Sequence, residues 1–175
     1  MHIVNLKTCN GNRQCARLVL KIIFVFVLLL HNRANAQHLG GSTDWRTFEV
    51  AEFGTRVQFP ASIFAPAGKP ERGSGQRFER SDGRVALSVS SERYGRKPAT
   101  YLRHNLRMDR SSLDYYRVAR SFFAISSERG GVILYSRCNF SRHAIHCFDL
   151  TYPRQEKRAW DAIVTRISLS LRPLG

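Results

Sequence analysis

Four side chains suited to metal or redox chemistry fall within ten positions of this sequence, namely Cys138, His143, His146 and Cys147. Thiolate and imidazole groups are preferred zinc ligands, and paired thiols can exchange with disulfides. The surrounding residues predict two strands joined by a turn, and strand positions three apart point to opposite faces. His143 and His146 are therefore not expected to share a metal ion, and His143 is expected in the turn. The order of residues also differs from the C-x-x-C-H motif that attaches haem. We expect no metal and no cofactor.

The two cysteines face each other if the turn centres on Arg142 and His143. That register also gathers apolar side chains on one face of the hairpin, which is how a register is usually specified. The pairs on that face are Tyr135 with Leu150, Arg137 with Phe148 and Ile133 with Tyr152. We predict a structural disulfide between Cys138 and Cys147. A redox-active pair is the alternative, but no C-x-x-C motif or helix N-terminus is present to lower a thiol pKa.

Hydrolytic chemistry has weaker support in the sequence. The same register places Ser136 opposite Asp149, but no histidine joins this pair, and His104 and Asp114 lie elsewhere in the chain. The sequence has neither the G-x-S-x-G turn of serine hydrolases nor the H-E-x-x-H motif of zinc proteases. We therefore assign no catalytic residue and expect a protein that is not an enzyme, with a hydrolase as the less favoured alternative.

Basic side chains form the best candidate binding surface. A helix that opens at Pro98 would place Arg103, Arg107 and Arg110 on one face, because these residues are spaced at i, i+4 and i+7. Arginine matches the geometry of phosphate and carboxylate groups better than lysine does. The predicted anion-binding residues are Arg96, Lys97, Arg103, Arg107 and Arg110. A solvated helix face, or a general bias toward arginine codons, would explain the same pattern.

The N-terminal segment has the three parts of a secretory signal peptide. Basic residues precede the apolar run 22–30, and Ala34-Asn35-Ala36 forms an A-x-A cleavage site. We predict a signal peptide over 1–36, cleaved after Ala36, and a flexible N-terminus over 37–43. Cleavage removes five basic residues and no acid, so the net charge falls from +15 to +10. An uncleaved membrane anchor is the alternative, but spanning a bilayer takes roughly 20 apolar residues.

The remaining residues, 44–175, predict a single α+β domain with a mainly antiparallel β-sheet of hairpins. Alternating patterns predict strands over 45–50, 53–59, 76–80, 84–90, 115–127 and the segment around the cysteines. Residues 61–75 are rich in proline and glycine and predict a long surface loop. A mid-chain helix opens at Pro98, and a C-terminal helix runs from Gln155. Its apolar stripe predicts core packing on the sheet through Ala159, Trp160, Ile163, Ile167 and Leu171.

Several short segments resemble those of small secreted bacterial proteins of unknown function. These are Phe59-Pro60-Ala61, the hairpin 78–85, Tyr152-Pro153 and the helix segment 160–164. The order of elements also resembles the PsbP-like α/β/α sandwich. That resemblance implies a binding or assembly role rather than catalysis, and it supplies no catalytic residues.

The expected protein is therefore small, basic and exported, either periplasmic or secreted. Its arginine side chains are expected to bind an anionic envelope component, such as a phosphorylated lipid or an acidic protein. A module that contacts another envelope protein is the alternative. Nucleic acid is not an expected partner after export, and a membrane is expected to be met only through the signal segment before cleavage.

Overall fold

The computed structural model describes residues 44–104, 106 and 109–173. The chain divides into two compact units, Met1–His38 and Leu39–Gly175, and the described residues belong to the second. The predicted signal peptide over 1–36, its cleavage site and the predicted flexible segment over 37–43 lie outside the described residues, as does Arg107.

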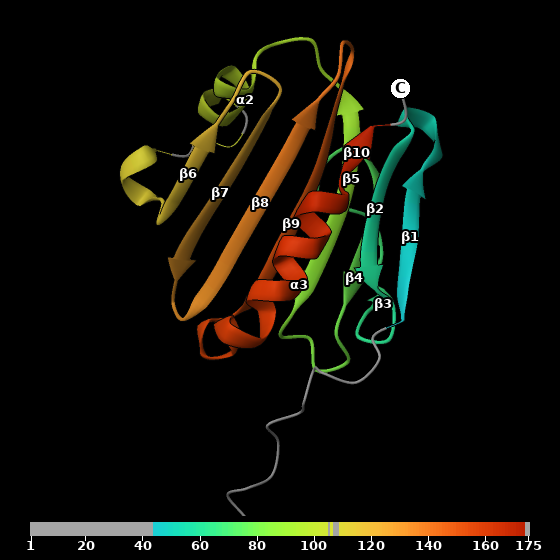
Figure 1. Ribbon diagram of the computed structural model, residues 1–175, viewed down its shortest axis with the longest axis vertical. Coiled ribbons are helices and arrows are strands. Elements are labelled where there is room, and N and C mark those ends of the chain that lie inside the picture. The colour runs from blue at the N-terminus through green and yellow to red at the C-terminus, as the bar shows by residue number, and fades with distance from the viewer. Residues whose placement is uncertain (1–43, 105, 107–108, 174–175) are drawn as a thin grey trace, which may run out of the picture. The chain divides into compact units, whose positions relative to one another are not determined.

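A seven-stranded antiparallel sheet is the main element of the fold (Figure 1). Its strands follow the order β3-β4-β5-β9-β8-β7-β6. Their bounds are β3 Ala65–Pro66, β4 Ser74–Glu79, β5 Ala86–Arg93, β6 Tyr115–Val118, β7 Phe122–Arg129, β8 Val132–Phe140 and β9 Ala144–Pro153. Most neighbours in this order are also consecutive along the chain, so hairpins build most of the sheet.

A second sheet has three strands in the order β1-β2-β10. Their bounds are β1 Trp45–Val50, β2 Thr55–Pro60 and β10 Arg172–Pro173. The helices are α2 Pro98–His104 and α3 Lys157–Ser170, with short 3-10 turns η1 Ala51–Phe53, η2 Arg110–Ser112 and η3 Arg154–Glu156. The predicted α+β class, with a mainly antiparallel sheet and two helices, is confirmed.

The larger core lies on one face of the seven-stranded sheet, beneath α3 and the small sheet (Figure 1). Trp160 and Ile167 of α3 are fully buried there against Phe148 and Leu150 of β9. The apolar stripe predicted for the C-terminal helix is confirmed at these positions. Ala159 is the exception, because it is exposed.

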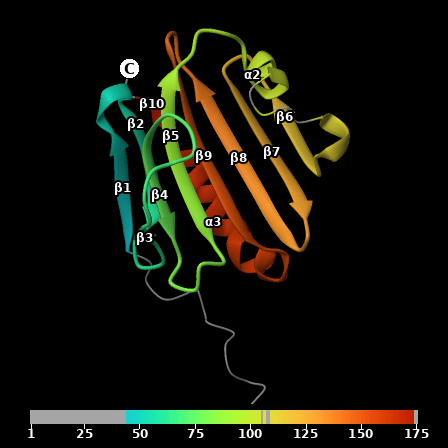
Figure 2. The same ribbon diagram turned by 180° about the vertical axis from the view of Figure 1, so that it is seen from behind.

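The smaller core lies on the opposite face, where α2 covers one end of the sheet. Tyr101 and Leu102 of α2 pack there with Phe123 of β7 and the two cysteines. Figure 2 shows this face of the sheet, with the segment between β3 and β4 crossing in front of the strands. The two faces are therefore covered unequally, and much of this second face carries small polar side chains.

The predicted register of the last hairpin is correct throughout. β8 and β9 pair with Cys138 opposite Cys147, Ser136 opposite Asp149 and Tyr135 opposite Leu150. The predicted pairs Arg137 with Phe148 and Ile133 with Tyr152 also form. One apolar face was enough to specify the pairing, because a slip by one residue would turn that face to the other side.

Three elements differ from the prediction. The mid-chain helix ends at His104, and a separate turn, η2, follows at Arg110–Ser112, where the Asp109 side chain accepts a hydrogen bond from the Ser111 amide. The segment 115–127 forms two strands rather than one, since the Ala119 amide donates to the Phe122 carbonyl (2.8 Å) and closes a hairpin without glycine or proline. The loop predicted over 61–75 contains β3 and the first residues of β4.

Gly75 explains why β4 can begin inside a glycine-rich segment. Its φ is +152°, and a Cβ at this position would collide with the carbonyl of Val89 on β5. Glycine is needed here because the two backbones approach each other so closely.

Candidate functional site

Three connections and one helix meet at one end of the seven-stranded sheet. The Tyr94 amide, after β5, donates to the His143 carbonyl in the β8–β9 turn (2.9 Å). The Phe140 amide at the end of β8 donates to the Ser121 carbonyl in the β6–β7 turn (2.7 Å). Figure 1 shows the segment after β5, the β8–β9 turn and α2 at this same end. Backbone hydrogen bonds thus fix segments that are far apart in the sequence.

This end carries six exposed cations, which we call the basic end. They are Arg93, Arg96, Lys97, Arg103, Arg120 and Arg142. Among the described residues, none of the six forms an ion pair, whereas arginines elsewhere do, including Arg56 with Glu49 and Arg154 with Glu128. Glu92 is the acid next to Arg93 in the sequence, and it accepts a hydrogen bond from the buried Tyr101 hydroxyl (2.9 Å). Burial and this contact raise the pKa of Tyr101, so its hydroxyl remains the donor.

The fold brings only some of the predicted anion-binding residues to the basic end. Arg96, Lys97 and Arg103 lie at the basic end. The expected alignment of Arg110 with Arg103 is wrong, because α2 ends before Arg110 and the Arg110 guanidinium lies over the Tyr116 ring, 5.1 Å from its centroid.

Sequence reasoning missed Arg93, Arg120 and Arg142. Each comes from a strand end or a turn, and no local spacing connects it with the others. Only the pairing of β5, β7, β8 and β9 brings these positions together.

A polar pocket of about 420 Å³ opens on the sheet face away from α3. Its base is a row of residues in register across neighbouring strands, with Ser88 and Ser136 on either side of Asp149. The row ends at Ile125 on one side and Arg77 on the other, and the rest of the lining includes Leu134, Leu106, Thr151, Glu71 and Arg72. Ala86, Ser88 and Ser90, which alternate with the buried Val85, Leu87 and Val89, all line this pocket.

Asp149 is the most unusual ionisable group in the pocket. It remains half-buried because the pocket opens onto it, yet the protein surrounds its carboxyl closely. Burial raises the pKa of Asp149, while the Ser136 hydroxyl and the charge of Arg72 partly oppose the rise. The arrangement favours a ligand that can donate hydrogen bonds to this carboxyl group.

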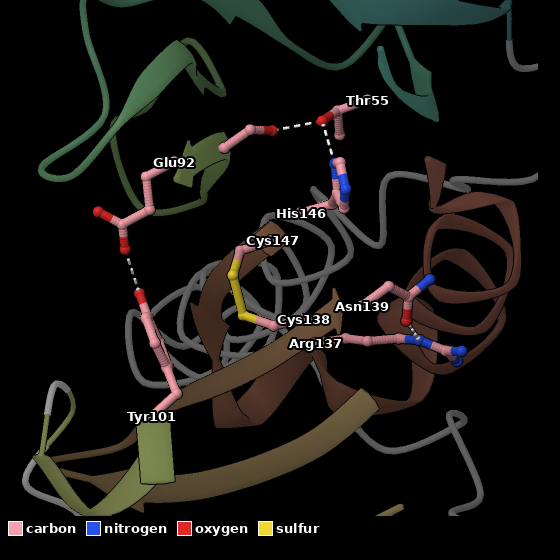
Figure 3. Close-up of a disulfide and its surroundings, with 9 residues drawn as sticks. Thr55, Glu92, Tyr101, Arg137, Cys138, Asn139, His146 and Cys147 are labelled. Carbon is pink, nitrogen blue, oxygen red and sulfur yellow. Dashed lines mark hydrogen bonds between the residues drawn. A yellow bond between two sulfur atoms is a disulfide. The ribbon is translucent and has the colours of Figure 1, made fainter. Parts of the chain in front are cut away.

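The predicted disulfide between Cys138 and Cys147 is present (Figure 3). The cysteines are 2% and 5% exposed, and they pack beneath Tyr101 and Leu102 of α2. No free cysteine occurs within the described ranges. A disulfide so well covered is typical of a structural link rather than an exchange centre.

The two histidines of the hairpin occupy different environments. His143 is exposed in the turn, as predicted, whereas His146 is 1% exposed. The Nδ1 atom of His146 lies 2.6 Å from Thr55 Oγ1 (Figure 3), and its Nε2 atom lies 3.1 Å from Ser141 Oγ. Burial lowers the pKa of His146, which favours a neutral ring that links β9 to the small sheet.

His146 does not complete a catalytic group with Ser136 and Asp149. Alternation along β9 places its ring on the face opposite Asp149. No cluster of three or more potential metal ligands occurs in the part of the chain that the structure describes. In those same residues, no helix has the length and apolar character needed to cross a membrane.

No family model and no curated protein matches the chain. Fourteen solved chains do match it. One is cyanobacterial PsbP (CyanoP) from Synechocystis sp. PCC 6803, with a TM-score of 0.56 and 12% sequence identity, covering 82% of this chain and 99% of that one. At this identity the likeness concerns the fold alone. The predicted PsbP-like arrangement is thereby confirmed, and the protein has a PsbP-like α+β fold.

Proposed function

We propose that this protein is an exported, non-enzymatic binding module that holds an anionic partner through its basic end. The observation that carries the proposal is the convergence of six exposed, unpaired cations, supplied by α2 and three connections of one sheet. Backbone hydrogen bonds between these connections hold the cations together, so little ordering is needed when a partner binds.

The chemistry of these side chains supports an anionic partner. Five of the six are arginines, whose planar groups can contact phosphate or carboxylate oxygens with two hydrogen bonds. A cluster of one sign also attracts an oppositely charged surface, and salt screens this attraction over roughly 8–10 Å. The N-terminal signal pattern and the buried disulfide support export to an oxidising compartment. The partner is thus an anionic component of the cell envelope.

Charge reversal at the basic end tests the proposal. The processed chain is compared with an Arg103→Glu/Arg142→Glu variant by co-sedimentation with vesicles of phosphatidylglycerol and phosphatidylcholine at physiological ionic strength. Arg129→Glu/Arg158→Glu is the matched control, because both of its sites are exposed and it changes the net charge equally.

We expect the wild type and the control to bind and the Arg103→Glu/Arg142→Glu variant to bind at least about tenfold more weakly. Vesicles of phosphatidylcholine alone should bind none of the three proteins. Equal binding by both variants, or equal losses in both, would overturn the assignment to the basic end.

A second candidate function is a protein-interaction module that uses the edge strand β6. This strand has a neighbour on one side only, and its Tyr115 and Tyr116 are 43% and 38% exposed. An extended segment of a partner could add to such an edge through backbone hydrogen bonds. Binding of this kind would be indifferent to Arg103→Glu/Arg142→Glu and lost when the edge is blocked by Tyr116→Pro, which removes a backbone donor that points away from β7.

A further inference from the structure

The polar pocket lies on a part of the molecule that the proposed function does not use. Its floor is one row across five strands, formed by Arg77, Ser88, Asp149, Ser136 and Ile125 in register. Such a row places all five side chains on one face of the sheet. A volume of about 420 Å³ lies within the range that holds small organic ligands.

Two polar groups at the base have unfilled bonding capacity. Ser136 is 2% exposed, and its Oγ atom lies close enough to the Asp149 carboxyl to influence it but completes no hydrogen bond of good geometry among the described residues. Buried hydroxyls without a partner are uncommon in native proteins and cost about 1–3 kcal/mol. Asp149 forms no ion pair within the described residues, and the charge of Arg72 reaches it only through space. The Asp149 carboxyl group and the adjacent Ser136 hydroxyl therefore face the same space.

We propose that this pocket binds a small organic molecule through a single primary ammonium group, held at the base by Asp149, Ser136 and Ser88. An ammonium group has three donors, which match one carboxylate and two flanking hydroxyl oxygens. The aliphatic body of the ligand lies against Ile125, at the end of the floor row, and against Leu134 beside it.

The charges at the mouth restrict the ligand further. Arg72 and Arg77 both line the pocket, and Arg77 is paired with Glu79. A second ammonium group at the mouth would meet the charge of Arg72, whereas a carboxylate would be attracted to it. Glu71, beside Arg72, weakens this preference without removing it. The favoured class is thus a monoamine, with an amino acid preferred over a diamine.

Titration with simple probes tests the proposal. Butylammonium, 1-butanol and 1,4-diaminobutane are added in turn to the processed chain, and amide chemical shifts are followed by NMR. We expect saturable shifts with butylammonium at the amides of Ser88, Ser136 and Asp149, and weaker binding of the diamine. Butanol has the same shape without the charge and should produce no saturable shift at these positions.

Two variants separate the proposed contact from a loss of folding. Asp149→Asn keeps the shape and removes the charge, and it should weaken butylammonium binding at least about tenfold with an otherwise native spectrum. Asp161→Asn, an exposed site on α3, is the control and should bind as the wild type does. The basic-end variant Arg103→Glu/Arg142→Glu should also bind butylammonium normally, so the two proposals fail independently.

The pH dependence gives a further readout. Protons compete with the ammonium group for Asp149, so affinity should fall as the pH falls through the pKa of this carboxyl group. Arg72, Glu71 and Tyr101 are the other ionisable groups that act on it, and Arg72 stays charged throughout. Equal binding of butanol and butylammonium, unchanged affinity in Asp149→Asn, or no saturable shift with any amine would overturn the proposal.

Discussion

Glu156 links the β4–β5 hairpin to the start of α3. Its carboxylate accepts hydrogen bonds from Arg80 (2.6 and 3.0 Å) and from the indole of Trp160 (3.1 Å), and it also pairs with Arg84. Glu156 is half-buried, although it lies opposite the apolar stripe of the C-terminal helix. An i+4 contact to Trp160 is visible in the sequence, whereas the two arginines come from a distant turn.

Removing the Glu156 charge should destabilise the fold. Glu156→Gln leaves Arg80 partly buried without its main partner, and we expect a loss of about 2 kcal/mol in the free energy of unfolding. Urea denaturation at neutral pH measures this loss. Asp161→Asn breaks only the exposed pair with Lys157 and should change stability by less than about 0.5 kcal/mol. Equal effects of both substitutions would contradict the role given to Glu156.

The same group should make the fold sensitive to acid. The Arg80 guanidinium lowers the pKa of Glu156 from 4.5 to about 2. A carboxyl group whose pKa is lowered in the folded state stabilises the fold above its unfolded pKa. This stabilisation should therefore be lost as the pH falls from about 4.5 toward 2. Unfolding followed across this range should show a clear decline in the wild type and a flatter profile in Glu156→Gln.

Asp149 should have the opposite effect on stability. Its pKa is raised in the folded protein, so the folded state binds a proton more tightly than the unfolded state does. At neutral pH, ionisation of this carboxyl group opposes folding. We expect Asp149→Asn to raise the urea midpoint at neutral pH and to have little effect under acid conditions. A lower midpoint at neutral pH would show that the carboxylate supports the fold rather than a ligand.

At the scale of elements, the disulfide joins the two strands on which the smaller core rests. Its cysteines are separated by nine positions, so the closed loop is short and the expected stabilisation is about 2–3 kcal/mol. Cys138→Ala/Cys147→Ala should lose this amount in urea denaturation. Reduction should destabilise the wild type similarly and leave the double variant unchanged. An effect of reductant on the variant would contradict a purely structural disulfide.

Elements that carry their own pattern could be predicted from the sequence. The β8–β9 register followed from one apolar face and two facing cysteines, and α3 followed from its stripe around Trp160. The end of α2 could not be predicted, because the helical spacing of Arg103, Arg107 and Arg110 continues past His104. The β6–β7 turn contains no glycine or proline to mark it.

The two candidate binding surfaces, the pocket and the basic end, were harder to predict from the sequence than the elements. Ser88 and Ser136 could be assigned to polar strand faces, but the pocket also needs the segment between β3 and β4, which passes over the sheet. Arg93, Arg120 and Arg142 share no local spacing. Their proximity comes from the order of the strands, which hydrophobic periodicity does not specify.

At the scale of the whole described fold, one sheet supports two different surfaces. Its end gathers cations from the connections, and its polar face forms the pocket, while α3 and the small sheet cover the other face. Charges outside the basic end are often paired, as in Arg80 with Glu156 and Arg56 with Glu49. Exposed cations without an ion pair also occur elsewhere, as at Arg129 and Arg158, but six of them gather at this end and give it a positive electrostatic character.

Amide hydrogen exchange with and without anionic vesicles tests most directly whether this end acts as one surface. The account predicts that segments 93–97, 119–121 and 141–143 gain protection together when phosphatidylglycerol vesicles are added. Arg103→Glu/Arg142→Glu should abolish the protection in all three segments, and Arg129→Glu/Arg158→Glu should preserve it. Protection confined to one segment, or centred on β6 instead, would contradict the account.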